Sequence, residues 1–342
     1  MAMSAVAVVL AVAWTLFATE EIEVGAAYTP AARGHETDTP RTERPVQSSL
    51  QSPMRRPGVS VVAAGDLSCD PANEMFRGGH GSPRWCRAED TAALIDAIDP
   101  DVVIPLGDTQ YDTGQLHDFR ASYDRHWGKQ LRRTRPVVGN HEYGASPDAD
   151  GYFTYFGDRA GRRGRGWYSY RLGSWHVVAL NSNCLLVACG PGSAQYRWLD
   201  RDLRTSRAAC TLVAMHHPRF SSGPHGDDPD LQLLRPMWRL LYDRGAEVVL
   251  GAHDHIYERF APMDPRGRKD QARGVRQFTA GTGGAEHYWI EQVRYASQVR
   301  EVDTFGVLNL TLLDGSYRWR FAPVAGSTFS DQGSDGCHRP PA

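Results

Sequence analysis

Residues 102–111 read VVIPLGDTQY, an apolar run followed by a glycine, Asp108 and, three positions later, Tyr111. A short apolar run that ends in glycine is typical of a buried strand, and the glycine allows the chain to bend sharply after it. The same order of an apolar run and then a polar residue recurs in VSVVAAGD (59–66), PVVGNHE (136–142), TLVAMHHP (211–218) and VVLGAHDH (248–255). The pattern predicts five strands, each ending in a residue that can bind a metal.

The segments between these runs predict the rest of the fold. Amphipathic helices are expected over 89–98, 193–203 and 231–242, a further strand over 277–280, and hairpins over 167–180 and 306–321. Alternating strands and helices with hairpins between them indicate an α/β protein with a largely buried mixed sheet. Ligands of open α/β sheets bind beyond the carboxyl ends of the strands, so the five strand ends can converge on one crevice.

The polar residues at the strand ends form a mixed set of nitrogen and oxygen donors. They are Asp66, Asp108, Tyr111, Asn140, His216, His253 and His255. Polar residues of these types are common in turns, but ordinary turns do not explain why all five predicted strands end in a residue that can bind a metal. A donor set without thiolate favours zinc, manganese or iron. Seven donors are too many for one tetrahedral ion and suit two ions that share a bridging carboxylate, an arrangement used in phosphoryl transfer.

In this order the motifs resemble those of the calcineurin-like metallophosphoesterases, and most of all their purple acid phosphatase branch. The motifs are GD (65–66), GDTQY (107–111), GNHE (139–142), VAMH (213–216) and HDHIYER (253–259). The resemblance covers about residues 58–325 and implies a four-layer αββα sandwich of two mixed sheets in a single catalytic domain. Many members carry DxH in the first motif, whereas Asp66 is followed by Leu67 and Ser68. This departure fits the purple branch, in which a tyrosine of the second motif supplies the missing ligand.

The resemblance implies a division of the donors between two metals. One metal is expected on Asp66, Tyr111 and His255, the other on Asn140, His216 and His253, with Asp108 as the bridge. A phenolate is a hard, anionic donor, so iron is expected at the Tyr111 site and iron, zinc or manganese at the second. Ala252 stands where the family commonly has glycine before the HxH segment, a departure that bears on the shape of this loop.

Two further histidines are candidates for contact with the substrate. His141 follows Asn140 and resembles the family's charge-stabilising histidine, and His225 lies on a loop after His216 that carries a substrate-facing histidine in related enzymes. His217 is expected to point away from the metals if its strand is extended, because successive side chains alternate. Glu258 and Arg259 are expected to support the HxH loop by pairing locally.

The function implied is a phosphatase that hydrolyses phosphate monoesters by attack of a metal-activated hydroxide. A phosphodiesterase or a nucleotidase would use the same site, and the difference would lie in the loops 67–90, 144–166 and 218–230. A non-catalytic surface binding module with a vestigial metal site is a third reading. The expected partner is a phosphate ester, and the oligomeric state stays open.

The amino terminus indicates export. Residues 1–18 are almost uninterrupted apolar sequence, on the border between a signal peptide and a membrane anchor, and a cleavage site of small residues follows at 24–26. We therefore expect a secreted or extracellular protein, or one anchored through residues 1–18. The domain plan is a signal peptide or anchor over 1–27, a linker rich in proline, threonine and arginine over 28–57, the catalytic domain over 58–325 and a tail over 326–342.

Export makes disulfides permissible, and the spacing of the six cysteines does not form a zinc pattern. Cys69 with Cys86, and Cys184 with Cys189, flank short loops and are candidate pairs. The tail is expected to pack loosely unless Cys337 is held.

Composition excludes several classes of protein. Of the 342 residues, 41% are hydrophobic and 23% are charged, which excludes wholesale disorder. A net charge of -2 gives no overall electrostatic footprint for nucleic acid. Lys129 and Lys269 are the only lysines among 38 lysines and arginines. We attribute this bias to genome composition and draw no conclusion about phosphate binding from it.

Overall fold

The computed structural model describes residues 58–338. The predicted leader over 1–27 and the linker over 28–57 lie outside the described residues. Within residues 58–338, no helix combines the length and the apolar character that a membrane span requires.

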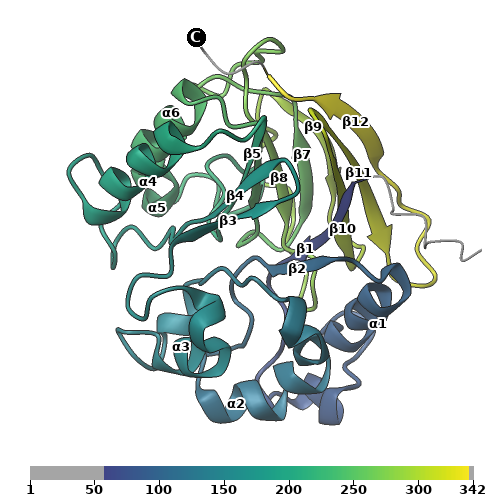
Figure 1. Cartoon of the computed structure of the whole chain (residues 1–342). Coiled ribbons are helices and arrows are strands. Elements are labelled where there is room, and N and C mark those ends of the chain that lie inside the picture. Colours follow the sequence, from purple (N-terminus) through teal and green to yellow (C-terminus); the bar gives the residue numbers. More distant parts are fainter. Residues whose placement is uncertain (1–57, 339–342) are drawn as a thin grey trace, which may run out of the picture. The chain divides into compact units, whose positions relative to one another are not determined.

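The strands form two mixed sheets (Figure 1). The first sheet has the order β12 (Gln332–Gly336), β11 (Ser316–Pro323), β10 (Gly306–Leu313), β1 (Val59–Ala64) and β2 (Val102–Pro105). The second has the order β3 (Tyr168–Leu172), β4 (Trp175–Ala179), β5 (Cys210–Ala214), β6 (Val248–Gly251), β8 (Arg276–Ala280), β7 (Tyr257–Phe260) and β9 (Ser297–Glu301). The pair β1–β2 and the run β4–β5–β6–β8 are parallel, and the remaining pairs are antiparallel.

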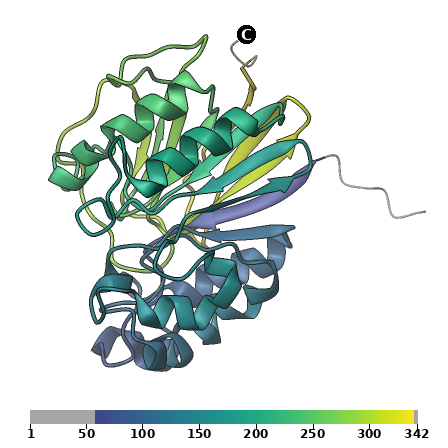
Figure 2. The same ribbon diagram turned by 60° about the vertical axis from the view of Figure 1, so that its left-hand side comes forward.

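Helices cover the outer face of each sheet (Figure 2). On the first sheet lie α1 (Ala88–Ile98), α2 (Leu116–Ala121) and α3 (Asp150–Phe156), and on the second lie α4 (Ala194–Thr205), α5 (Pro229–Leu233) and α6 (Arg235–Asp243). Short 3₁₀ turns are η1 (Glu74–Gly79), η2 (Tyr123–Arg125), η3 (Trp127–Arg133), η4 (His141–Tyr143) and η5 (Gly157–Ala160).

The alternation of side chains along each strand explains the layers. In β1, Val61 and Ala63 belong to the core between the two sheets, whereas Val62 and Ala64 pack against the helices. In β5, Leu212 faces the other sheet and Val213 faces α4 and α6. Both faces of these strands are buried, which is why they are apolar throughout. The predicted four-layer αββα sandwich with two mixed sheets is confirmed.

Two predicted elements differ in the structure. The helix expected over 231–242 is divided into α5 and α6 at Leu234, because Pro236 in the first turn of α6 has no N–H to continue the preceding helix. The strand expected over 136–138 is reduced to a single bridge between Leu106 and Val137. The helices α2 and α3 and the strands β7, β9 and β12 were not predicted.

The carboxyl-terminal segment takes part in the fold. Within 326–338, β12 adds a strand to the edge of the first sheet beside β11. Cys337 forms a disulfide with Cys210 at the start of β5, so the described part of the expected tail is held covalently. Both candidate disulfides, Cys69–Cys86 and Cys184–Cys189, are also present.

Candidate metal centre

The predicted strand ends meet at one edge of the two sheets. Asp66 and Asp108 follow β1 and β2, and His216 and His253 follow β5 and β6. Asp66, Asp108 and His253 have φ values of 59°, 46° and 70°, a left-handed conformation that costs energy for residues other than glycine. Such strain concentrates at functional sites, and here it turns three predicted donors inward.

Asp66, Tyr111 and His255 form one group of donors. The Tyr111 hydroxyl lies 3.2 Å from Oδ1 of Asp66 and 2.9 Å from Nε2 of His255. Nδ1 of His255 donates to the backbone carbonyl of Glu286 at 2.7 Å, which leaves the Nε2 lone pair facing the group. Tyr288 stacks on the His255 imidazole, with ring centroids 4.0 Å apart and an angle of 8° between the rings.

Asn140, His216 and His253 form the second group. Oδ1 of Asn140 lies 2.9 Å from Nε2 of His216 and 3.1 Å from Nδ1 of His253. Nδ1 of His216 donates to the carbonyl of Leu106 at 2.9 Å, so its Nε2 is again oriented by a backbone acceptor. The two imidazoles of the HxH segment point into different groups because the backbone turns at His253 and is not extended.

Asp108 lies between the two groups. Its Oδ2 is 3.1 Å from Nε2 of His216, its Oδ1 accepts the backbone N–H of His141 at 2.9 Å, and its side chain is 2% exposed. One donor atom each of Asp66, Asp108 and His216 lies within 4.8 Å of the other two. This is the position that a bridging ligand requires.

The charges of the centre fit bound cations. Burial, with a contribution from Asp108, raises the pKa of Asp66 well above its ordinary value. Burial opposes a charged His216, but the contact with Asp108 raises the pKa of this imidazole to about 9. Without cations, protons on Asp66 and on His216 limit the negative charge of the two buried carboxyl groups, and bound metal cations would take over this compensation.

Glu142 holds together the loop that contains Asp108 and Thr109 and the loop that contains Gly139. Its Oε1 accepts the backbone N–H and the hydroxyl of Thr109 at 2.6 and 2.7 Å, and its Oε2 accepts the N–H groups of Gly139 and Asp108 at 2.6 and 3.1 Å. A Cβ on Gly139 would collide with Oδ1 and the backbone nitrogen of Asp108, so glycine is required there. The sequence placed Glu142 in a motif but gave no role to its side chain.

The two predicted substrate histidines lie at the rim of the centre. Nε2 of His141 is 3.9 Å from Oδ2 of Asp108, and its Nδ1 donates to the carbonyl of Asp112 at 2.5 Å. The ring centroid of His225 is 4.7 Å from that of His253, and its Nδ1 lies 2.8 Å from Oδ2 of Asp228. Both side chains are 35% exposed, so each has one face toward solvent and one toward the donors.

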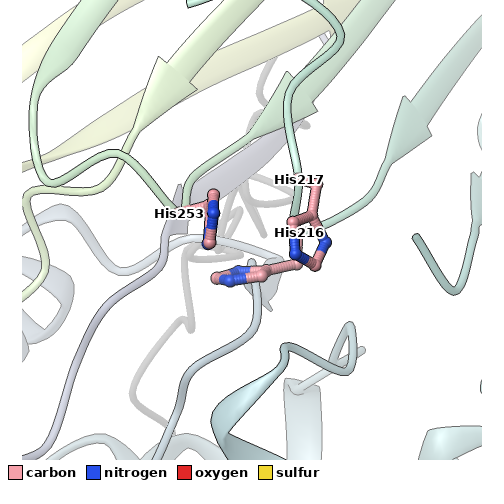
Figure 3. Close-up of side chains that lie close together, drawn as sticks. All are labelled: His216, His217 and His253. Atoms are coloured by element: carbon pink, nitrogen blue, oxygen red, sulfur yellow. The ribbon is translucent and has the colours of Figure 1, made fainter. Parts of the chain in front are cut away.

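His217 does not point away from the centre as expected. Its ring centroid lies 4.3 Å from that of His253, and a ring nitrogen of each of His216, His217 and His253 lies within 4.8 Å of the other two (Figure 3). The expectation was wrong because β5 ends at Ala214, so the alternation of an extended strand does not reach residue 217.

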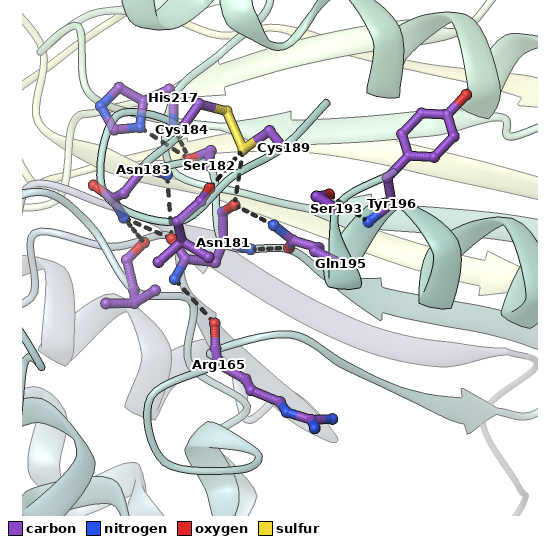
Figure 4. Close-up of a disulfide and its surroundings, with 12 residues drawn as sticks. Arg165, Asn181, Ser182, Asn183, Cys184, Cys189, Ser193, Gln195, Tyr196 and His217 are labelled. Carbon is purple, nitrogen blue, oxygen red and sulfur yellow. Dashed lines mark hydrogen bonds between the residues drawn. A yellow bond between two sulfur atoms is a disulfide. The ribbon is translucent and has the colours of Figure 1, made fainter. Parts of the chain in front are cut away.

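A neighbouring loop holds His217 in place (Figure 4). Ser182 Oγ accepts the backbone N–H of His217 at 2.8 Å and lies 2.9 Å from its Nδ1. The Cys184–Cys189 disulfide closes the loop that follows Ser182. Burial lowers the pKa of His217 to about 3, so this imidazole is neutral. No signal in the sequence linked Ser182 to the centre.

The support of the HxH loop also differs from the expectation. Glu258 accepts hydrogen bonds from the N–H and hydroxyl of Ser222 at 2.9 and 2.5 Å and from Ser297 at 2.5 Å. Arg259 forms an ion pair with Asp331 at 2.8 Å. Both residues hold the loop, as predicted, but through partners far along the chain rather than locally.

Comparison with known proteins identifies similar sequences. A family model described as calcineurin-like phosphoesterase matches residues 59–257. Purple acid phosphatase 21 of Arabidopsis thaliana is 29% identical over 255 residues, which cover 69% of this chain and 52% of that protein. Probable purple acid phosphatase 20 of the same plant is 26% identical over 235 residues, with 62% and 49% covered. The chain spans about half the length of these curated relatives.

Solved structures with the same fold include a purple acid phosphatase from yellow lupin seeds, with a TM-score of 0.60 and 16% identity over 84% of this chain and 55% of that one. A dimetal phosphatase from Danio rerio has a TM-score of 0.51 and 14% identity over 82% of this chain and 100% of that one. At these identities the likeness concerns the fold alone.

Proposed function

Because the chain belongs to the calcineurin-like phosphoesterase family, we propose that it is a binuclear-metal phosphatase that hydrolyses phosphate monoesters. The observation that carries this proposal is the position of Asp108. Its carboxylate lies beside His216 and within 4.8 Å of an Asp66 oxygen, between two groups of donors. The similarity to purple acid phosphatases supports the same activity.

The donors present suit two metals. Asp66, Tyr111 and His255 would hold one ion, Asn140, His216 and His253 would hold the other, and Asp108 would be shared. We propose iron at the Tyr111 site, because phenolate and carboxylate favour a trivalent ion, and iron, zinc or manganese at the second. When bound, the two metals supply neutralisation of the phosphate oxygens and activation of water.

The chain's own residues bind the ester and handle the proton of the leaving group. His141 has its Nδ1 bonded to the carbonyl of Asp112, so its Nε2 is free to face a phosphate oxygen above Asp108. Asp228 accepts from Nδ1 of His225 and orients this ring, which would donate a proton to the departing alkoxide. We therefore propose His141 and His225 as the groups that contact the substrate.

A comparison of two substrates tests the function. Purified protein is assayed with an aryl phosphate monoester and with the matching bis-aryl diester, and its metal content is measured in the same preparation. We expect the monoester to be hydrolysed faster. Faster hydrolysis of the diester favours a phosphodiesterase, and protein that purifies without metal and hydrolyses neither ester favours a binding module.

We propose that the protein is exported, with residues 1–27 as a signal peptide or anchor, 28–57 as a linker and a catalytic domain that begins at residue 58. All six cysteines lie in disulfides, which supports an oxidising compartment. Sequencing of the mature amino terminus tests this plan, and a retained Met1 in a cytosolic fraction contradicts it.

A further inference from the structure

An arginine-lined hollow lies beside the start of α6, apart from the residues of the metal centre. Its volume is about 530 Å³. The residues that line it are Arg219, Arg235, Pro236, Arg239, Pro265 and Arg266. Four of these six residues are arginines and none is acidic. The chain thus brings positive charge from three separate segments to one place, against the mutual repulsion of these groups.

Arg219 is the unusual member of the group. Arg219 is 7% exposed, and its Nε is buried without a hydrogen-bond partner within residues 58–338. The Phe220 ring lies against the guanidinium, with its centroid 4.5 Å from Cζ of Arg219. A buried charge without a partner costs several kcal/mol. An arginine retained in this position therefore points to an anion that the hollow receives.

The backbone at Arg219 is held firmly. Oε1 of Gln277 accepts the N–H groups of Arg219 and Phe220 at 3.0 and 3.1 Å, and Nε2 of Gln277 donates to the Phe220 carbonyl at 2.5 Å. The guanidinium is thus presented to the hollow by a fixed loop. Preorganised donors lose little freedom on binding, which favours recognition of a ligand.

The other arginines are available at the mouth of the hollow. Arg235 and Arg266 are exposed and form no ion pair within the described chain, although Arg235 donates to Gln232 at 3.0 Å. Arg239 is partly neutralised by Asp243 at 3.2 Å. Asp264 lies near the mouth and accepts the backbone N–H of Arg266 at 2.8 Å.

The first turn of α6 adds to the positive potential. Arg235 and Pro236 open this nine-residue helix, and the amino end of a helix favours anions. Planar guanidinium groups match the geometry of tetrahedral oxyanions. We propose that this hollow is a second binding site, for an oxyanion of the phosphate class, with Arg219 as its floor. The site goes beyond the phosphatase activity and does not depend on it.

Equilibrium dialysis with labelled inorganic phosphate tests the proposal on the full chain. The variants are Arg219→Met, which removes the buried charge, and the double variant R235S/R266S, which changes only exposed side chains. Arg318→Ser is the matched control, because Arg318 is exposed on β11 and outside the hollow. Methylenediphosphonate, which resists hydrolysis, is titrated in parallel to distinguish free phosphate from a phosphate group carried on a larger molecule.

We expect phosphate or the diphosphonate to bind the wild type and Arg318→Ser equally at this site. Both hollow variants should weaken that binding by about tenfold or more, since each removes charge-assisted hydrogen bonds. Without phosphate, Arg219→Met should unfold at the same temperature as the wild type or higher, because it removes an unpaired buried charge. Tighter binding of the diphosphonate identifies a carried phosphate group as the ligand.

Equal binding of both anions by all four proteins overturns the proposal. If Arg219→Met fails to fold, the double variant decides alone, because its changes lie on the surface. Turnover of a phosphate monoester is measured separately for the wild type and for the double variant. An absence of turnover in the wild type would contradict the proposed phosphatase activity and leave the anion-binding result standing.

Discussion

Replacement of Glu142 by glutamine tests how the metal centre is held together. Oε1 accepts the N–H and the hydroxyl of Thr109 and, at 3.4 Å, the N–H of Gln110, and Oε2 accepts the N–H groups of Gly139 and Asp108. Burial raises the pKa of Glu142, but with five donors around it and 1% exposure the side chain serves only as an acceptor. In Glu142→Gln one oxygen becomes an NH₂ group that faces at least two donors.

The magnitude follows from those contacts. A hydrogen bond to a charged group contributes ~1.5–3 kcal/mol, so the loss of two should lower the free energy of unfolding by about 3–6 kcal/mol. The bonds lost hold either the backbone of Asp108 or that of Thr109, so the bridging carboxylate should shift. Groups that orient metal ligands typically change metal affinity by about 10–100-fold when they are replaced.

Urea unfolding and metal titration measure the two effects. Glu74→Gln is the matched control, since Glu74 is exposed and makes no hydrogen bond through its carboxylate within residues 58–338. We expect Glu142→Gln to lose stability and metal affinity together while the control matches the wild type. Wild-type stability and full metal content in Glu142→Gln would refute the role that we assign to this carboxylate.

Three further predictions concern single features of the chain. Protein grown with iron should show a visible charge-transfer band, and Tyr111→Phe should abolish the band and leave the circular dichroism of the fold unchanged; an active, iron-free and colourless wild type would refute the iron site. The Cys210–Cys337 disulfide closes a loop with a sequence separation of 127, so replacing both cysteines by serine should cost up to about 5 kcal/mol in urea unfolding, and an unchanged midpoint would contradict this. Burial raises the pKa of Glu247 to about 8 from 4.5, so the folded state binds this proton more tightly than the unfolded state, and the free energy of unfolding should fall as pH rises from about 4.5 to about 8. Glu247→Gln should remove this loss, and parallel curves of stability against pH for the two proteins would refute it.

Local patterns predicted an α/β fold with buried strands and placed the candidate donors at the strand ends, whereas the four layers followed from the family resemblance. Each apolar run is short and buried, and four of the five contain a glycine shortly before a donor, as at Gly107 before Asp108. The resemblance to calcineurin-like phosphoesterases and to their purple acid phosphatase branch is confirmed by the comparisons.

The features that were missed depend on contacts between distant segments. Ser182 contacts His217 because the neighbouring strands β4 and β5 lie side by side. Arg259 forms its ion pair with Asp331, which lies between β11 and β12 and is 72 residues away in the sequence. The loop that places Arg219 under α6 is held by Gln277 of β8. None of these pairs has a local spacing that a sequence pattern could reveal.

The central claim is that two metals share Asp108, and metal content tests it most directly. The ratio of metal to protein is measured for the wild type and for Asp108→Asn, with turnover of a phosphate monoester in the same samples. We expect two ions per wild-type chain, the loss of at least one in the variant, and turnover lower by about 10³ or more. An Asp108→Asn protein that retains both ions and turns over substrate at nearly the wild-type rate would contradict it.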